Sequence, residues 1–519
     1  MSTSHGHPVS SVGRSRRRGR AHHEARRPEQ PPFVLHRRPF LPVEILADEQ
    51  IDSIHLASLE VLRDVGVEVL HPEARQLLVA AGCRFDGAER IYFDPDAVEA
   101  AVATAPSVFT LHAPNPAHDV QIGDDSVVFT SVASAPNVIG NGHARRSGNR
   151  ADFQNLVRLT QALNAIQIHA GYPVEPSDIH ASVRHLHATH DILTLSDKAP
   201  NVYSLGAQRN DDCLEMVRIA RGVSDEQLDE QPSVTTVINT NSPLRIDHPM
   251  AEGLVRYARR GQVCIVTPFT LAGAMAPISI SGALVQQNAE ALAGITIAQL
   301  ARPGAPVVYG GFTSNVDMRS GAPAFGTPEF MQAALVGGQL ARRYGLPYRS
   351  SNVCAANVLD AQAGYESVFS LWGAVMGGAN IVFHGAGWME GGLHASFEKM
   401  VLDADLISMV GRFLQPLSTE AADLAVETIR EVGPGGHFFG SAQTQAGFRT
   451  AFFKPMVSDW SNHESWIEAG SPTALDHAER LVDELLDGYE APVLDQTVRD
   501  QLEDFVAHRV AEGGVFTDF

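Results

Sequence analysis

The sequence predicts an α/β protein: a TIM-type (β/α)8 barrel with an N-terminal α+β subdomain and a mostly helical C-terminal extension. Three observations carry this prediction. The chain has 519 residues, more than one minimal core requires. Its composition, 44% hydrophobic and 19% charged, is ordinary for a globular protein. From about Val127 onward, short apolar runs alternate with longer stretches of helical periodicity.

The first 125 residues precede this alternation and divide into two parts. Residues 1–32 are rich in Ser, Gly, His, Pro and Arg, with seven arginines against two glutamates, and we expect a disordered basic tail. Residues 33–125 are predicted to form the N-terminal subdomain. It contains a helix over 48–65 with Asp48 as its N-cap, then short strands, then a helix over 94–105.

Residues 126–414 are predicted to form the barrel, and residues 415–519 the helical extension. The candidate strands are 127–131, 166–171, 201–205, 234–239, 263–269, 306–311, 347–352 and 380–384. The candidate helices are 152–163, 179–195, 211–221, 249–259, 286–300, 328–343, 361–376 and 397–413. Most of these helices begin near Asp, Pro or Ser. Eight alternations favour a closed barrel, and an open doubly wound sheet is the alternative.

Composition also restricts the partners and the compartment. The net charge of −21 repels phosphate backbones and argues against nucleic acid. The four cysteines form no C-x-x-C pair, so we expect no disulfide framework and a cytoplasmic location. The uncharged run 262–288 is interrupted by Pro268 and Pro277, and we interpret it as a buried strand and loop, not a membrane span. We recognise no export signal.

Common catalytic motifs are absent from the sequence. It contains no H-E-x-x-H, G-x-S-x-G or G-x-x-x-x-G-K-S/T, which argues against zincin, nucleophile-elbow hydrolase and P-loop chemistry. His180, His185, His187 and His190 fall on one predicted helix, and we interpret them as a solvated face. The sequence thus predicts no metal site and assigns no catalytic residue.

Candidate substrate-binding residues lie where the predicted strands end, because ligand groups collect at the carboxyl ends of parallel strands. The last strand ends at His384, and its Gly-rich exit carries Trp388 and Glu390. Aromatic faces attract quaternary ammonium groups through cation–π contacts worth about 0.5–2 kcal/mol each. The full candidate set is Tyr309, Phe312, Asn352, Gln362, His384, Trp388 and Glu390.

Six ordered blocks of the chain resemble the trimethylamine methyltransferase (MttB-like) family of corrinoid-dependent methyltransferases. The blocks are VEILADEQIDSIHLASLEVLRDVGVEV, LAGAMAPISISGALVQQNAEALAGI, MRSGAPAFGTPEF, LDAQAGYES, HGAGWMEGG and REVGPGGHFFG. The resemblance implies a barrel that moves a methyl group from a methylated amine to the cobalt of a corrinoid (cobalamin) held by a separate small protein. We also expect a homo-oligomer.

Two departures from the family pattern affect the expected substrate. Founding members carry pyrrolysine in the segment that aligns with 352–354, whereas only standard residues occur here. The resemblance then implies a quaternary amine such as glycine betaine. From their places at the predicted strand ends, Asn352, Gln362 and His384 are candidate anchors for its carboxylate. Many relatives also have a T-D-S-K-like run where this chain has Cys354-Ala355-Ala356-Asn357. The exact amine therefore stays open.

Three alternatives remain at this point. The first is an enzyme of the same family that acts on another methylamine. The second is a metal-dependent barrel hydrolase or lyase that uses Asp360, His384 and Glu390. The third is a catalytically silent betaine-binding protein.

Overall fold

The structure is a computed structural model that describes residues 28–139 and 144–516. Most of the predicted basic tail, residues 1–27, lies outside the described residues. Residues 28–32 are described, and Gln30 contacts the end of the first helix of the ring, where its Nε2 donates to the carbonyl of Ala162 at 2.8 Å.

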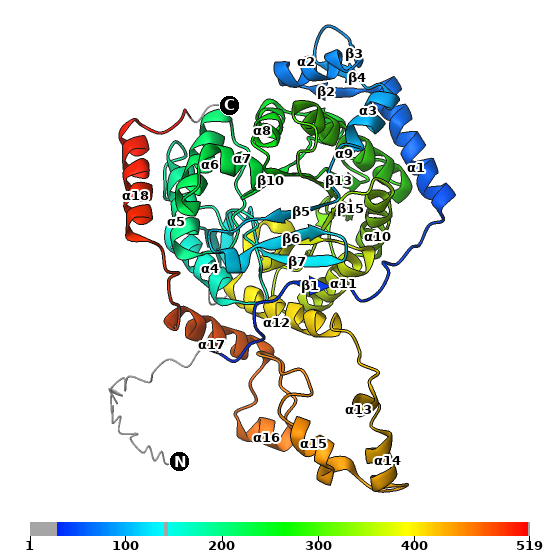
Figure 1. Ribbon diagram of the computed structural model, residues 1–519, viewed down its shortest axis with the longest axis vertical. Coiled ribbons are helices and arrows are strands. Elements are labelled where there is room, and N and C mark those ends of the chain that lie inside the picture. The colour runs from blue at the N-terminus through cyan, green and yellow to red at the C-terminus, as the bar shows by residue number, and fades with distance from the viewer. Residues whose placement is uncertain (1–27, 140–143, 517–519) are drawn as a thin grey trace, which may run out of the picture.

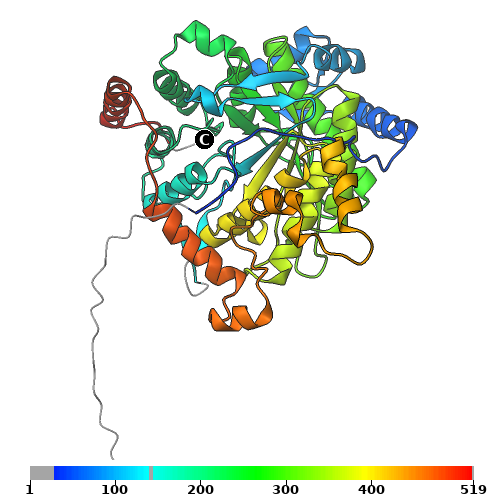
Figure 2. The same ribbon diagram turned by 60° about the horizontal axis from the view of Figure 1, so that its bottom comes forward.

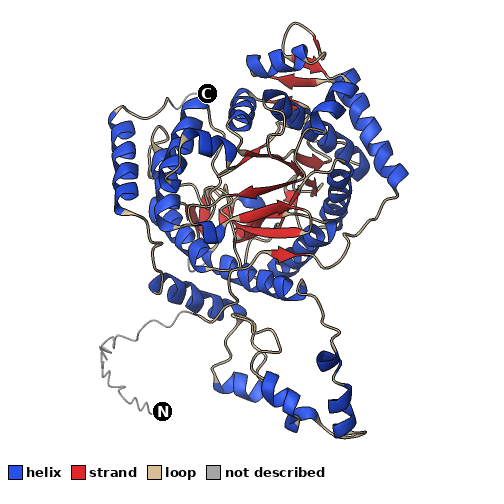
Figure 3. Ribbon diagram, viewed as in Figure 1, coloured by secondary structure: helices blue, strands red, loops and turns tan. Residues whose placement is uncertain are grey.

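A mixed α/β arrangement with one central sheet forms the body of the molecule (Figures 1 and 3). The first strand in the sheet order pairs antiparallel with its neighbour, and all the other pairs are parallel. In sheet order the strands are β1 (His36–Arg37), β7 (Ser126–Ser131), β18 (Ile381–Ala386), β17 (Tyr348–Ser351), β14 (Val307–Gly310), β12 (Val263–Val266) and β10 (Thr235–Ile238).

Six of the eight predicted barrel strands are strands of this sheet. The predicted strands 166–171 and 201–205 form only isolated parallel bridges, so the paired strands make an incomplete ring. Pro200 has no N–H for a ladder, and Gly171 has a φ of 123°, outside the β region. The bridges are Thr130 with Ile168, Ile168 with Ala199, and Asn201 with Thr235.

Helices surround the sheet in Figure 1. Their bounds are α4 (Arg150–Ala162), α5 (Arg184–Leu195), α6 (Ala207–Arg221), α7 (Asp225–Glu230), α8 (His248–Arg259), α9 (Ile280–Ala301), α10 (Pro328–Arg343), α11 (Ala361–Gly377) and α12 (Phe397–Phe413). Helix α11 begins after Asp360, whose carboxylate caps the N–H of Gln362 at 2.9 Å.

The strands bury apolar side chains on both faces, as parallel sheets do. Val128, Val308 and Ile381 belong to one internal cluster, whereas their neighbours Tyr309 and Val382 belong to the larger core that includes the helices. The hairpin of β5 (Val108–Leu111) and β6 (Val120–Gly123) adds residues to the internal cluster. This hairpin thus covers one end of the ring and leaves the other end for a site.

The N-terminal subdomain lies beside the helices (Figures 1 and 2). Its sheet follows the order β11 (Arg245–Ile246), β2 (Val67–Val69), β4 (Arg90–Tyr92), β3 (Arg84–Phe85), so a strand from the barrel region completes it. Its helices are α1 (Asp48–Glu60), α2 (Pro72–Ala80) and α3 (Pro95–Val102). The N-cap of α1 is Ala47, and the predicted cap Asp48 lies in the first turn instead. A π-helical turn continues α1 to Val65.

The C-terminal extension divides into a loosely packed and a docked part. Helices α17 (Ala474–Asp487) and α18 (Gln496–Ala511) pack on the ring, α17 against α12 and α4, and α18 against α5 and α6. The preceding helices have no buried residue. These are α13 (Ala421–Leu424), α14 (Val426–Val432), α15 (Ala442–Gly447) and α16 (His463–Glu468). None of the helices in the described part of the chain combines the length and apolarity needed to cross a bilayer.

Short strands beyond the ends of the central strands complete the fold. They form one sheet of β13 (Phe269–Ala272), β15 (Phe312–Val316) and β16 (Pro323–Ala324). They also form a second sheet of β19 (Trp388–Met389), β20 (His394–Ala395), β8 (Asn137–Ile139) and β9 (Arg145–Ser147). Both sheets stand next to the carboxyl ends of the central strands.

Candidate functional site

A pocket of about 400 Å³ lies at the carboxyl ends of the central strands. Asn239 follows β10, Thr267 follows β12, and Phe312 follows β14, while Arg349 and His384 belong to β17 and β18. The other lining residues are Ala133, Ser134, Ala170, Tyr203, Ser204, Leu205, Val237, Met250, Phe269, Phe383, Trp388, Gly391 and Gly392. Ligand sites of parallel α/β proteins occur at this end.

Aromatic side chains form one wall of the pocket. The ring of Phe312 lies 5.1 Å from that of Phe269 and 6.3 Å from that of Trp388, centroid to centroid. Phe325 supports this wall from behind, 5.3 Å from Trp388 and 1% exposed. Aromatic faces arranged around a small cavity suit a cationic ligand group.

Arg349 places a positive charge inside the ring of strands. Its side chain is 2% exposed, and its guanidinium lies 4.9 Å from the ring centroids of both Phe312 and Phe383. Burial lowers the pKa of Arg349 to about 9, so the group stays charged at neutral pH. The only hydrogen bond of the guanidinium within the described chain is a long one, 3.4 Å from Nη1 to the carbonyl of Gly311. No carboxylate of the described residues pairs with it.

His384 lies beside Arg349 in an uncommon backbone conformation. Its φ is 53°, in the left-handed region, and the pairing of β18 with β7 is irregular between Val382 and Ala386. The imidazole stacks on Trp388 at 5.1 Å and 16°. Burial, aided by the charge of Arg349, holds the pKa of His384 well below its usual range, so the ring is neutral. Its Nδ1 is buried and has no hydrogen-bond partner in the described chain.

A buried ion pair holds the turn between His384 and Trp388. The N–H of Gly387 donates to Asp403 Oδ2 at 2.9 Å, and Lys399 Nζ donates to the same oxygen at 2.6 Å. Lys399 and Asp403 are 2% and 3% exposed. Helix α12 thus fixes the backbone that presents both aromatic rings to the pocket.

Of the seven predicted substrate-binding residues, Phe312, His384 and Trp388 line the pocket. The Tyr309 hydroxyl instead donates to Asn288 Oδ1 at 3.0 Å, on the helix side of β14. Asn352 is buried, and its Nδ2 donates to the carbonyl of Gly385 at 2.9 Å, next to His384.

The remaining two predicted residues are engaged elsewhere. Gln362 is exposed and donates to Glu366 Oε1 at 2.7 Å. Glu390 accepts from Arg145 Nη1 at 2.9 Å and from His394 Nδ1 at 2.8 Å. Burial alone raises the pKa of Glu390, but the hydrogen bonds from His394 and Arg145 outweigh it and lower the pKa overall. Neither Gln362 nor Glu390 lines the pocket: the first contacts its own helix, and the second is paired with Arg145 of β9.

Asp360, His384 and Glu390 do not come together as a metal site. Asp360 caps α11, and Glu390 is paired with Arg145. Among residues 28–139 and 144–516, the one group of His, Cys, Asp and Glu side chains close enough to hold an ion contains none of the three. Cys354 is fully buried, and burial raises the pKa of its thiol to about 12.

Sequence reasoning did not single out Arg349 or Tyr203. The signal for Arg349 was a lone charge within the otherwise uncharged predicted strand 347–352. Tyr203 comes from the third predicted strand, far from the other aromatic residues in sequence. Its hydroxyl forms a hydrogen bond with Ser134 Oγ at 2.9 Å, and Ser134 is another residue that lines the pocket.

Comparison with known proteins places the chain in a family. The profile described as trimethylamine methyltransferase matches residues 12–514. The glycine betaine methyltransferase of Desulfitobacterium hafniense (strain Y51) is 34% identical over 471 residues, which cover 91% of this chain and 98% of that protein. The trimethylamine methyltransferase of Desulfitobacterium hafniense (strain DSM 10664 / DCB-2) is 29% identical, covering 90% and 94%.

Among solved structures, the monomethylamine methyltransferase of Methanosarcina barkeri aligns over 90% of this chain and 95% of its own, with a TM-score of 0.47 and 13% sequence identity. The profile match spans nearly the whole chain, and the first relative exceeds 30% identity over nearly its full length. This chain therefore belongs to the trimethylamine methyltransferase family.

Proposed function

We propose that this protein transfers a methyl group from a quaternary amine that bears a carboxylate, such as glycine betaine, to the cobalt of a corrinoid on a separate small protein. The observation that carries the proposal is Arg349, a buried cation without a carboxylate partner in the described chain, which lies beside the aromatic wall of the pocket. The similarity to the glycine betaine methyltransferase of Desulfitobacterium hafniense supports the same substrate class.

The pocket offers complementary groups to the two ends of such a substrate. The guanidinium of Arg349 can take the carboxylate as a charge-assisted hydrogen-bonded pair. The faces of Phe312 and Trp388 can contact the trimethylammonium group, which cannot accept or donate hydrogen bonds. Anchoring both ends orients the N–CH3 bond and supplies the positioning that a displacement reaction requires.

Methyl transfer from a quaternary amine needs no proton at the leaving group. The C–N bond breaks, nitrogen keeps the electron pair, and a neutral tertiary amine leaves. The pocket-lining residues include no Asp, Glu, Lys or Cys, and the imidazole of His384 is neutral, which suits this chemistry. Reduced corrinoid supplies the cobalt nucleophile. The contribution of this chain is to bind, orient and desolvate the donor.

The proposal includes a closed eight-stranded barrel. The parallel bridges at Ile168, Ala199 and Asn201 support closure, because they continue the parallel pairing from β7 round to β10. It also includes the division into an N-terminal subdomain (33–125), the barrel (126–414) and a helical C-terminal extension (415–519). The homo-oligomer that we expect from the sequence stays a prediction.

We expect the purified full-length chain to form methylcobalt from cobalt(I) corrinoid and glycine betaine. The measurement is the change in corrinoid absorbance with glycine betaine, proline betaine, carnitine, choline and trimethylamine in parallel. Turnover of trimethylamine alone would contradict the substrate class. Tight binding of a betaine without any methyl transfer, even with a corrinoid protein added, would favour the silent binding protein.

We expect Trp388→Ala to weaken glycine betaine binding by about 1–3 kcal/mol, because it removes a cation–π contact and part of the pocket wall. Isothermal titration calorimetry measures the affinity. Trp372→Ala is the matched control, since Trp372 packs on Phe413 outside the pocket at a ring distance of 5.0 Å. Equal affinities for the two variants would remove Trp388 from the binding site.

A further inference from the structure

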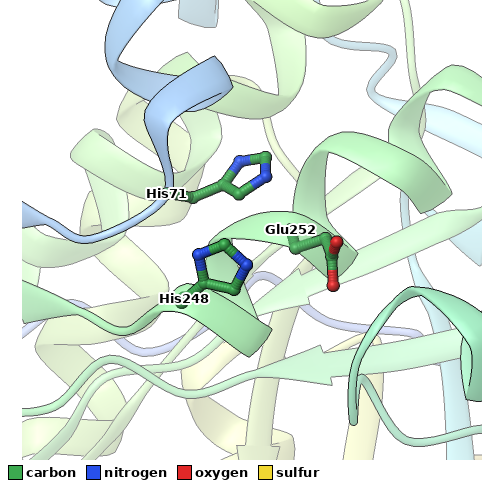
Figure 4. Close-up of side chains that lie close together, drawn as sticks. All are labelled: His71, His248 and Glu252. Carbon is green, nitrogen blue, oxygen red and sulfur yellow. The ribbon is translucent and has the colours of Figure 1, made fainter. Parts of the chain in front are cut away.

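Two histidines and a glutamate meet where the N-terminal subdomain joins the ring of helices (Figure 4). His71 is the N-cap residue of α2, His248 is the first residue of α8, and Glu252 follows one turn later on α8. Their ligand atoms all lie within 4.8 Å of one another, and the two imidazole rings are 4.9 Å apart at 72°. Figure 4 shows the ring of His71 above the first turn of α8, facing His248 and Glu252.

One ring nitrogen of this group is buried without a partner in the described chain, whereas His248 is exposed. His71 is 8% exposed, and its Nδ1 is buried with no hydrogen-bond partner in the described chain. A buried polar atom without a partner is costly and calls for a ligand or water. His55, a more deeply buried histidine of the same subdomain, shows the contrast: its Nδ1 contacts the Tyr344 hydroxyl at 2.8 Å and its Nε2 contacts Glu99 at 3.2 Å.

The carboxylate of Glu252 is held in place by the backbone. The N–H of Ala207 donates to its Oε2 at 2.8 Å, which leaves Oε1 available to a ligand. Supporting hydrogen bonds of this kind orient carboxylates that bind metals.

We propose that His71, His248 and Glu252 bind one Zn²⁺ ion, with water as the fourth ligand. Two imidazole nitrogens and one carboxylate oxygen form a donor set that zinc prefers, whereas Mg²⁺ and Ca²⁺ favour oxygen-only sites. Spacing of i and i+4 puts His248 and Glu252 on the same face of α8, and His71 supplies the third ligand from another element.

The ion would join two parts of the chain that already touch. Strand β11, just before α8, pairs with β2, just before His71, so the ligands flank an existing junction. Met250, between the two α8 ligands, lines the substrate pocket. Zinc bound to His248 and Glu252 would therefore hold the first turn of α8 in place, and Met250 of this turn borders the pocket. None of the three proposed ligands lines the pocket, so the role of the metal would be structural.

The test uses tag-free full-length protein treated with a chelator and then titrated with ZnCl2. We expect one equivalent to bind by calorimetry, and the melting temperature to rise by about 2–4 °C, because the folded state alone binds the ion. Co²⁺ in place of Zn²⁺ should give the absorption of a tetrahedral site. A wild-type chain that binds no stoichiometric zinc would overturn the proposal.

Three variants assign the ligands. His71→Ala and His248→Ala should each weaken zinc binding by more than about 10-fold. Glu252→Gln keeps an acceptor for the Ala207 N–H, so it should stay folded while it also loses affinity. His508→Ala is the matched control: His508 in the last turn of α18 and the C-cap residue Glu512 have the same spacing and contact each other at 3.1 Å. Loss of zinc from His508→Ala, or none from the other three, would also refute the site.

Discussion

Arg349→Met is expected to lower the affinity for glycine betaine by about 2–5 kcal/mol, at least roughly 30-fold, because it removes the buried cation that we propose as the partner of the substrate carboxylate. At the same time the melting temperature should stay the same or rise. An isolated buried charge destabilises a protein, and methionine fills similar volume without that cost. Calorimetry gives the affinity, and thermal unfolding gives the stability.

Arg349→Lys is the control for this prediction. Lysine keeps the charge but loses the planar fork that binds a carboxylate through two hydrogen bonds, so its affinity should fall between those of the wild type and the methionine variant. An unfolded Arg349→Met variant would mean that the guanidinium supports the fold. Wild-type affinity in a folded variant would place the carboxylate elsewhere in the pocket.

Lys399→Met is expected to destabilise the protein by about 3–5 kcal/mol, because it leaves the Asp403 carboxylate buried without its cation. Asp403 also accepts from Gly387, so the turn that carries His384 and Trp388 should loosen and substrate affinity should fall. Urea unfolding measures the stability. Arg430→Ala, which breaks an exposed pair with Glu427, should change it by less than about 1 kcal/mol.

The pH dependence of this variant tests the mechanism. Burial raises the pKa of Asp403 above its ordinary value, and loss of Lys399 should raise it further. Because the folded-state pKa is raised, ionisation of this carboxyl lowers the free energy of unfolding as the pH increases. This loss of stability disappears at low pH, where the group is protonated in both the folded and the unfolded state. The stability difference from the wild type should therefore shrink as the pH falls toward the ordinary pKa of an aspartate. A difference that does not vary with pH would point to lost packing instead.

Local sequence signals predicted most elements of the fold. The helices over 152–163, 328–343 and 361–376 correspond closely to α4, α10 and α11, because capping residues and apolar periodicity mark their ends. The predicted strands 166–171 and 201–205 form bridges only; Gly171 leaves the β region at the end of the first, and Pro200, just before the second, has no N–H to donate. Apolar character alone does not reveal such breaks.

The site was harder to predict than the fold, for a physical reason. A strand buried on both faces has no polar side to indicate which residues face the interior. Tyr309 and Phe312 were therefore equivalent in the sequence, yet the first contacts Asn288 behind the sheet and the second lines the pocket. The proposed zinc ligands were not recognised because contacts between segments far apart in the sequence, such as the pairing of β2 with β11, bring His71 to α8.

In the proposed binding mode, the fixed charge of Arg349 would also determine which amines the pocket excludes. A cation about 5 Å from a buried guanidinium experiences a repulsion of about 3 kcal/mol at an effective dielectric constant of 20. Choline and tetramethylammonium carry a net positive charge and bear this repulsion in full, whereas a betaine brings its own negative charge to cancel it. The proposed site would thus select by net charge as well as by shape, and it would favour zwitterions over cations of nearly the same size.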